Sequence, residues 1–516
     1  MQRIGVVGAG AMGAGIAQVA AQAGLGVLLY DIGPGPLENG LRRIRSGLDR
    51  LVERGKLTPP DRDAVLDRIT TTSALADFGD VLFVIEAVPE ILDLKRQIFA
   101  ELDRICPTGA ILATNTSSLS VTEVGAATGR PASVVGMHFF NPVPAMKLVE
   151  VVRGARTGPE AAERTTELSR RLGKTPVQAK DTPGFIVNRI ARPFPGEALR
   201  LLGENTASAR QIDRIARLAG GFRMGPFELM DLVGMDVNFA VNRSVFEQYF
   251  YDPRFRPHPL QAQMVKANLL GRKTGEGWYQ YRDGELVNGP EGARFYGQPG
   301  PLLPGPVYVL GDKAMAQLVR QAGYEVTSDS EEAAIVVCRT MLRLEEVSRA
   351  ALVLVETSSS TTTGHAADLP SPGRVVGYGG IPSVADRHLV EVAPGLKTSP
   401  EALEQACAFF HSLGRDTEVV QDSFGMVAPR IIACLVNEAA YALMEGIATA
   451  ADIDTAMKLG VNYPLGPLEW ADRIGLHQVL EILHYLHEHT GDDRYRPCPL
   501  LRKLVIARLP FHSKSH

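Results

Sequence analysis

The chain has 516 residues, with 54 lysines and arginines against 58 aspartates and glutamates, so its formal net charge is only −4. A chain of this length forms several domains. Nearly balanced charge provides no general attraction for nucleic acid or for an anionic membrane surface, so we expect neither partner.

The five cysteines form no CxxC pair and no cluster with histidine of the kind that holds a metal ion. This usage is typical of reduced thiols, so we expect no metal, no disulfide and a cytoplasmic location. The first residues lead directly into a strand pattern, without a charged segment, a long apolar run or a cleavage site, as expected for a protein that stays in the cytoplasm.

The first strand pattern runs into a GxGxxG motif formed by Gly8, Gly10 and Gly13, and a helical pattern follows. In this context the glycines permit a tight turn and the close approach of a pyrophosphate to the start of the helix. The next strand pattern ends in Asp31, whose carboxylate can bind a ribose 2′-hydroxyl and would repel a 2′-phosphate. These residues predict NAD rather than NADP; the alternative is a glycine-rich turn without a ligand.

Strand and helix patterns then alternate as far as residue 180, with one long helical stretch at residues 36–67. Such alternation predicts an α/β domain with a doubly wound, Rossmann-type parallel sheet, whose ligands lie beyond the carboxyl ends of the strands. Polar side chains occur at those ends, including Glu86, Asn115 and Ser117.

His138 ends one of these strand patterns, and Glu150 lies on the next. A carboxylate beside an imidazole fixes its tautomer and stabilises the imidazolium that forms when the ring takes a proton. The pair is therefore a candidate general base. The alternative is a core histidine satisfied by a neighbouring acid.

From Asp181 onward the pattern becomes mostly helical and ends in a glycine-rich loop that carries Lys273. Four motifs then resemble the 3-hydroxyacyl-CoA dehydrogenase family: HFFNPVPAMKLVEV at 138–151, DTPGFIVNR at 181–189, GPFELMDLVG at 225–234 and GRKTGEGWY at 271–279. The resemblance implies NAD-dependent oxidation of a (3S)-3-hydroxyacyl-CoA to the 3-ketoacyl-CoA, as in fatty acid metabolism.

By this resemblance His138 is the catalytic base, Glu150 orients it, and Ser117 and Asn188 hold the substrate. Where the family often has a serine that contacts coenzyme A, this chain has Gly47, which leaves Arg54 and Lys56 as candidates for that contact. The residues implied around NAD are Gly8, Gly10, Gly13, Asp31, Glu86, Lys95, Asn115, Ser117, Asn141 and Lys273.

The second half of the chain repeats the first. Adding 241 to a residue number takes residues 116–118 to Thr357-Ser358-Ser359, 148–150 to Leu389-Val390-Glu391, and 225–229 to Gly466-Pro467-Leu468-Glu469-Trp470. A constant offset over this distance indicates an internal duplication without gaps.

The repeat lacks the residues that the chemistry needs. The three glycines correspond approximately to Gly311, Lys313 and Ala316, while His138 becomes Gly379, Asn141 becomes Pro382 and Asn188 becomes Pro429. We therefore expect one NAD site, in the first half, and a second half that contributes packing rather than catalysis.

The resulting domain prediction is a Rossmann domain at 1–181, a helical domain at 182–281, a linker at 282–306, a degenerate Rossmann-like domain at 307–421 and a second helical domain at 422–516. Because single-unit members of the family resemble homodimers joined through the helical domain, the two helical domains are expected to form a pseudo-dimer within one chain, with a further homo-oligomer left open.

The substrate remains open at this point. The C-terminal motifs ADIDTAMKLGVNYPLGPLEW and RYRPCPLLR resemble the long bacterial form of the family, associated with phenylacetate catabolism, which implies 3-hydroxyadipyl-CoA; 3-hydroxybutyryl-CoA is the alternative. A different class of function, a catalytically silent nucleotide-binding scaffold, is disfavoured by the complete set of polar residues in the first half.

Overall fold

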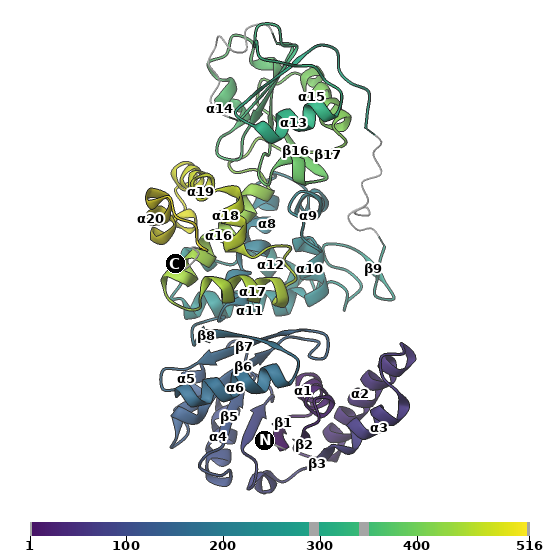
Figure 1. Cartoon of the computed structure of the whole chain (residues 1–516), viewed down its shortest axis with the longest axis vertical. Helices are drawn as coiled ribbons and strands as arrows, with labels where there is room; N and C mark the ends of the chain where they lie inside the picture. The colour runs from purple at the N-terminus through teal and green to yellow at the C-terminus, as the bar shows by residue number, and fades with distance from the viewer. Residues whose placement is uncertain (1–2, 288–298, 340–349, 513–516) are drawn as a thin grey trace. The chain divides into compact units, whose positions relative to one another are not determined.

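The computed structural model of the protein describes residues 3–287, 299–339 and 350–512. By their contacts the residues fall into two compact units. The first comprises residues 1–189 together with 442–461, and the second comprises 190–441 together with 462–516. Each unit contains one large β-sheet (Figure 1).

The sheet of the first unit has the strand order β3-β2-β1-β4-β5-β6-β7-β8, and all neighbouring strands are parallel except β6 and β7. This order reverses between β1 and β4, as in a doubly wound fold, so the predicted fold class is confirmed. The strands are β1 (Arg3–Val7), β2 (Gly26–Tyr30), β3 (Ile69–Thr72), β4 (Phe83–Glu86), β5 (Ile111–Thr114), β6 (Val134–Phe139), β7 (Leu148–Arg153) and β8 (Thr175–Lys180).

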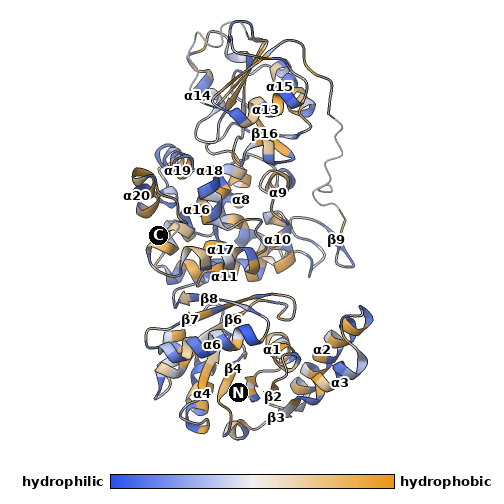
Figure 2. Cartoon of the chain, viewed as in Figure 1, coloured by the Kyte–Doolittle hydropathy of each residue, from blue (hydrophilic) through white to orange (hydrophobic). Residues whose placement is uncertain are grey.

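Helices cover this sheet because its strands are apolar on both faces. Alternate strand residues such as Val6 and Ile85 form one buried cluster with Ile16, Ile44 and Leu168 of the covering helices. Figure 2 shows the hydrophobic strands and the hydrophilic outer side of helices such as α6. The helices are α1 (Ala11–Gln22), α2 (Pro34–Glu53), α3 (Pro59–Asp67), α4 (Leu92–Ile105), α5 (Val121–Gly125), α6 (Pro159–Arg171) and α7 (Val187–Ile190).

The helical character predicted for residues 36–67 is confirmed except at residues 54–58, where the chain breaks between α2 and α3. Thr58 ends the break: its hydroxyl accepts a hydrogen bond from the Asp61 backbone N–H, and Pro59 begins the next helix. An N-cap threonine followed by proline is a strong start signal, which the basic pattern of this stretch obscured.

The second unit contains most of both helical segments. The helices that follow the first sheet are α8 (Pro193–Gly203), α9 (Ala209–Leu218), α10 (Pro226–Val233), α11 (Met235–Gln248) and α12 (Pro259–Lys266). Near the C-terminus lie α16 (Ala428–Met444), α17 (Ala450–Gly460), α18 (Pro467–Ile474), α19 (Leu476–Thr490) and α20 (Pro499–Ala507), of which α17 belongs to the first unit.

A short antiparallel pair, β9 (Tyr281–Arg282) and β10 (Glu285–Leu286), occupies the start of the predicted linker, and part of that linker lies outside the described residues. The domain limits derived from the sequence therefore stay predictions.

The sheet of the second unit repeats the first in reduced form. Its order is β12-β11-β13-β14-β15-β16-β17, with β15 and β16 antiparallel, and nothing in its described residues corresponds to α2, α3 and β3. Its elements are β11 (Val307–Leu310), α13 (Lys313–Gln321), β12 (Val326–Thr327), β13 (Ile335–Cys338), β14 (Leu352–Glu356), α14 (Thr362–Ala366), β15 (Val375–Tyr378), β16 (Leu389–Pro394), α15 (Pro400–Ser412) and β17 (Asp416–Val419).

At the end of each sheet a backbone N–H donates a hydrogen bond to the helical segment of the other half. In the first unit the Lys180 N–H donates to the Ile447 carbonyl at 2.9 Å. In the second unit the Gln421 N–H donates to the Thr206 carbonyl, also at 2.9 Å. These contacts are related by the same offset that relates the two halves of the sequence.

Arginine–glutamate pairs recur in the same way. Arg189 donates to both carboxylate oxygens of Glu445 at 2.6 and 3.1 Å in the first unit. Arg430 donates to both oxygens of Glu204 at 2.6 and 2.9 Å in the second unit. In each unit the arginine of one half therefore pairs with the equivalent glutamate of the other half.

Among the described residues no helix combines the length and apolar character that crossing a membrane requires. All five cysteines lie among the described residues, and none of them forms a disulfide.

Candidate active site

The glycine turn lies between β1 and α1. Gly8 has φ +106°, which glycine adopts without strain, and its N–H donates to the Tyr30 carbonyl at 2.8 Å. A Cβ on Gly13 would lie 1.8 Å from the Gly8 carbonyl oxygen, whereas a Cβ on Gly10 would have no atom within 4 Å. The turn is therefore closed by glycine on its inner side and has open space beside Gly10, so it fits a pyrophosphate at the helix N-terminus.

Asp31 lies beside this turn, directly after β2. One of its carboxylate oxygens accepts the Ala9 N–H at 2.7 Å and the other accepts the Ile32 N–H at 2.8 Å. The hydrogen bond to Ala9 joins the acid to the glycine turn, as an acid that binds the ribose of the same dinucleotide requires.

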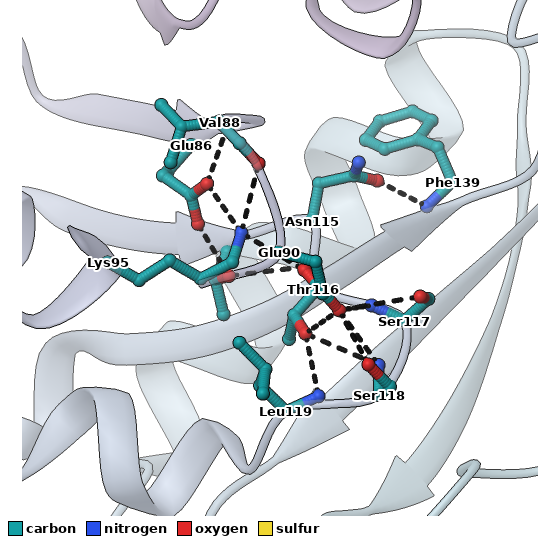
Figure 3. Close-up of polar contacts among 11 residues, drawn as sticks. Glu86, Val88, Glu90, Lys95, Asn115, Thr116, Ser117, Ser118, Leu119 and Phe139 are labelled. Atoms are coloured by element: carbon teal, nitrogen blue, oxygen red, sulfur yellow. Dashed lines mark hydrogen bonds and ion pairs between the residues drawn. The ribbon is translucent and has the colours of Figure 1, made fainter. Parts of the chain in front are cut away.

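Glu86 ends β4 and is fully buried. Its carboxylate accepts hydrogen bonds from the Lys95 ammonium and the Thr114 hydroxyl, each at 2.7 Å (Figure 3). Lys95, which is 1% exposed, also lies 3.3 Å from a carboxylate oxygen of Glu90. The lysine predicted to lie around NAD therefore links two acids at the carboxyl end of the sheet.

Glu90 is a residue that the sequence reasoning missed. Its Oε1 accepts hydrogen bonds from the Thr116 hydroxyl at 2.6 Å and from the Ser117 and Ser118 N–H groups at 2.9 and 3.1 Å (Figure 3). Burial opposes ionisation, but Lys95 and these donors outweigh it and hold the pKa of Glu90 below its ordinary value. Its position in the loop after β4, at the same sheet edge as Asn115, was the available signal.

His138 and Glu150 are directly opposite each other on the antiparallel strands β6 and β7. The imidazole Nδ1 lies 2.6 Å from Glu150 Oε2, and the residues are 5% and 0% exposed. The other carboxylate oxygen accepts the Ile186 and Val187 N–H groups at 3.1 and 2.9 Å. The acid is thus fixed by the backbone on one side and holds the histidine on the other.

The predicted substrate residues meet at the same edge. The Asn188 side-chain amide donates to the Ser117 carbonyl at 3.3 Å, and Asn115 Oδ1 accepts the Phe139 N–H at 2.9 Å. The Phe185 ring stands edge-on to the His138 ring at 5.8 Å, so the imidazole has an aromatic neighbour.

The remaining predicted residues lie elsewhere. Asn141 is exposed and precedes the cis peptide bond to Pro142. Arg54 and Lys56 are exposed beyond the end of α2. Lys273 belongs to the second unit, where its ammonium forms an ion pair with Asp236.

Gly47 faces α1. A Cβ at this position would lie 2.8 Å from the Gln18 side-chain oxygen, so glycine permits the close packing of α2 on α1 here. This contact gives a packing reason for the departure from the family pattern.

The second half has a glutamate equivalent to Glu150 but no histidine equivalent to His138. Glu391 is fully buried, and its carboxylate accepts the Val427 and Ala428 N–H groups at 2.7 and 2.9 Å. Burial raises its pKa. The Arg387 guanidinium donates to the carbonyl of Gly379, the residue that replaces the histidine.

The predicted correspondence of Asn141 with Pro382 is wrong by one residue. The second cis bond joins Ile381 to Pro382, so Pro382 matches Pro142 and Ile381 matches Asn141. The cis proline is thus shifted by one residue within a loop of unchanged length, because β16 begins at Leu389, 241 positions after Leu148 of β7.

Comparison with known proteins identifies the family. The profile described as "3-hydroxyacyl-CoA dehydrogenase, NAD binding domain" matches residues 3–182 and 338–423. The profile described as "3-hydroxyacyl-CoA dehydrogenase, C-terminal domain" matches residues 184–281 and 425–512. The chain therefore belongs to the 3-hydroxyacyl-CoA dehydrogenase family: it is an NAD-dependent oxidoreductase that acts on 3-hydroxyacyl-CoA, with both family domains present twice.

Its relatives have two lengths. The 3-hydroxyadipyl-CoA dehydrogenase of Escherichia coli (strain K12) is 38% identical over 513 residues, 99% of each chain. The crystal structure of 3-hydroxybutyryl-CoA dehydrogenase from Escherichia coli K12 is also 38% identical, with a TM-score of 0.83 over 98% of each chain. The probable 3-hydroxybutyryl-CoA dehydrogenase of Deinococcus radiodurans is 46% identical over 279 residues, which is 54% of this chain and 100% of the relative.

Proposed function

We propose that the first half alone carries the catalytic site and that His138 is its general base. The observation that supports this most strongly is the 2.6 Å contact between His138 Nδ1 and Glu150. A carboxylate at Nδ1 favours the tautomer with its proton on Nδ1, which leaves a lone pair on Nε2. Within the described part of the chain, Nε2 makes no hydrogen bond, so it is available to the hydroxyl group of a substrate.

In this mechanism Nε2 takes the proton of the substrate 3-hydroxyl, and the buried carboxylate of Glu150 stabilises the imidazolium. A positioned base of this kind contributes roughly 10²–10⁴-fold to the rate. NAD, when bound, supplies the acceptor for the hydride that leaves C3.

The glycine turn and Asp31 would hold NAD by its pyrophosphate and ribose. We propose that Glu86, Lys95, Asn115 and Asn141 also lie around the cofactor, with Lys95 acting through the acids Glu86 and Glu90 that it contacts at 2.7 and 3.3 Å.

Ser117 and Asn188 would hold the substrate, since both are polar and lie at the sheet edge near His138. Arg54 and Lys56 are the candidates for the phosphates of coenzyme A because both are cationic and exposed.

The acyl group we propose is the dicarboxylic 3-hydroxyadipyl chain, in phenylacetate degradation. Support comes from the Escherichia coli 3-hydroxyadipyl-CoA dehydrogenase, which matches over both halves. The second candidate is 3-hydroxybutyryl-CoA, favoured by the higher identity, 46%, to the half-length Deinococcus relative. A silent scaffold is disfavoured because the His138–Glu150 contact is intact.

We also propose that one chain takes the place of a homodimer, in the cytoplasm where coenzyme A thioesters are available. Contacts between the two helical segments support this within the second unit. Phe222 packs against Tyr463 and Trp470 with ring centres 5.0 and 5.2 Å apart, and Arg254 donates to Glu438 at 3.0 Å.

The test is NADH formation by the full-length chain with a panel of (3S)-3-hydroxyacyl-CoA thioesters that includes the adipyl and butyryl compounds. We expect the highest kcat/KM with the adipyl compound, and a much lower value with NADP in place of NAD because Asp31 repels the 2′-phosphate. A higher kcat/KM for the butyryl compound would favour the second candidate. Equal kcat/KM with NADP and NAD would refute the role of Asp31. No turnover of any thioester would refute the proposed dehydrogenase site.

A further inference from the structure

The first sheet is contacted by a segment from the far end of the chain. Residues 442–461 belong to the first unit, and Ile447 accepts the N–H of Lys180 at the end of β8. A Cβ on Gly460 would lie 2.8 Å from Leu148 and 2.9 Å from Val187, so the backbone of α17 packs tightly on both. The second half therefore touches residues next to Glu150.

The strongest polar contact of this segment is the pair Arg189–Glu445. Arg189 is fully buried, and its guanidinium donates to both oxygens of Glu445 at 2.6 and 3.1 Å. A buried guanidinium needs a carboxylate in this two-point geometry, because an unpaired buried charge is strongly unfavourable. Glu445 thus determines where Arg189 can lie.

Arg189 closes the turn that holds the catalytic acid. Its N–H donates to the Gly184 carbonyl at 3.1 Å, and between them Ile186 and Val187 donate to Glu150. Phe185 in the same turn has φ +49°, a left-handed conformation that its surroundings must maintain. Residues 184–189 therefore form a turn that contacts both acids. Its Arg189 side chain pairs with Glu445, and its backbone N–H groups donate to Glu150.

We propose that Glu445, from the second half, is a positioning residue for the His138–Glu150 pair and acts through Arg189 and the 184–189 turn. This rests on the proposed role of His138 as base. The second half, which lacks a histidine of its own at the equivalent place, then contributes to the reaction by fixing the acid that orients the base.

The duplication provides a matched control. Arg430 is 1% exposed and donates to both oxygens of Glu204, and Glu391 accepts two N–H groups from the following turn. The arginine–glutamate and glutamate–backbone contacts recur, and Arg430 donates in addition to Glu197 and Tyr495 at 3.0 and 2.6 Å, but Gly379 stands where the histidine would be. Loss of Glu204 should therefore disturb Glu391, which has no histidine beside it to orient.

The experiment compares Glu445→Gln with Glu204→Gln in the full-length chain. For Glu445→Gln we expect kcat to fall about tenfold or more, because a base displaced from its working geometry loses part of its roughly 10²–10⁴-fold contribution. We expect KM for NAD to stay within about twofold. The pH–kcat profile should also shift from that of the wild type, because the geometry between the base and its carboxylate changes.

Glu204→Gln should leave kcat and the pH profile at their wild-type values, although its thermal unfolding temperature falls as well. Glu445→Asp, which keeps the charge, should recover part of the lost kcat. A purely structural role would lower the unfolding temperature of Glu445→Gln without moving the pH profile, and that result would overturn the proposal.

A second variant covers the case in which Glu445→Gln does not fold. Gly460→Ala places a Cβ against Val187 and Leu148 without removing a charge, and it should move the pH–kcat profile in the same direction. A wild-type profile in this variant would also refute the proposal. His138→Ala tells a failure of the proposed base from a failure of the proposed role of Glu445. Near wild-type turnover of His138→Ala would refute His138 as the base. An inactive His138→Ala together with wild-type kinetics of Glu445→Gln would refute only the positioning role of Glu445.

Discussion

The two halves of the chain differ in what they have kept. Strands β5 to β8 of the first sheet recur as β14 to β17 of the second with the same order and the same antiparallel pair. The glycine turn, by contrast, has become Lys313 and Ala316, and α2, α3 and β3 have no counterpart in the described part of the second half. Strands β5 to β8 are thus retained, whereas the described part of the second half lacks the glycine turn and the segment from α2 to β3.

The pair proposed as catalytic, His138 and Glu150, differs between the halves at a single position. Glu391 persists although its histidine is lost, because its carboxylate satisfies the buried N–H groups of Val427 and Ala428. Its removal would leave two buried donors unpaired, at about 1–3 kcal/mol each. Replacing the histidine by Gly379 leaves no such donors. The second half therefore lacks the histidine, which packing does not require, and keeps the glutamate, which the backbone does require.

The largest expected difference between the halves is in the effect on kcat of substituting His138 or its counterpart Gly379. His138→Ala should lower kcat by about 10²-fold or more, with little change in NAD affinity, because the base acts mainly in the transition state. Gly379→Ala should be silent, since the added Cβ would have ordinary contacts with Met426 at 3.4 Å. Steady-state kinetics of both variants measure this, and an active His138→Ala would show that the halves do not differ in the way described.

The second difference is in cofactor binding. Calorimetric titration of the wild-type chain should give one NAD per chain. Gly13→Ala should weaken binding by about tenfold or more, equivalent to about 1.4 kcal/mol, because its Cβ cannot fit 1.8 Å from the Gly8 oxygen.

Ala316→Gly, the reverse change at the equivalent position, should not create a second site because the Asp312 carboxylate still caps the N-terminus of α13. A stoichiometry of two in the wild-type chain would contradict the division of roles.

The third prediction removes the second half altogether. Deleting residues 303–516 removes Glu445, the carboxylate that pairs with Arg189. It also uncovers Phe222, which packs on Tyr463 and Trp470. The fragment should dimerise or aggregate when its mass is measured by light scattering, and a monomeric fragment with full activity would show that the second half is dispensable.

The smallest expected effect concerns a lysine and its arginine counterpart. Lys174 donates to the Val143 and Met146 carbonyls at 2.5 and 2.7 Å, and burial lowers its pKa from 10.5 to about 8. In the second half Arg415 donates to the equivalent loop, to the carbonyls of Val384 and Ala385. Only the lysine can lose its proton in the pH range where the protein can be studied.

Between pH 8 and 10 the unfolded chain therefore binds more protons at Lys174 than the folded chain does, so the folding stability contributed by this residue rises with pH. The wild-type chain should gain on the order of 1 kcal/mol over Lys174→Arg between pH 7.5 and 9.5. Chemical denaturation at both pH values measures the difference. A constant difference would mean that the ammonium is not penalised by burial.

Much of the fold and of the candidate site could be predicted because the signals are local. The glycine spacing and the acid after β2 are short patterns with one common geometry. His138 and Glu150 lie on consecutive strand patterns, so their pairing followed from the sheet alone. The second sheet followed from a constant offset in the sequence.

The rest depends on contacts between distant residues. Arg189 and Glu445 are 256 positions apart, and nothing near either residue indicates the other. Glu90 was missed because its donors come from the loop after β5, which only the folded sheet places beside it. The one-residue shift of the cis proline after β15 escaped notice because the motifs on both sides keep the same offset.

The contact between β8 and residue 447 also bears on how the chain folds as it is made. β8 is the last strand of its sheet, and an edge strand with free backbone groups is a template for wrong pairing. Its covering segment is synthesised far later, and at roughly 5–20 residues per second the ribosome needs on the order of tens of seconds to reach it. The first sheet therefore emerges complete in sequence but with an open edge, and the nascent chain should depend on chaperones until its C-terminal segment appears.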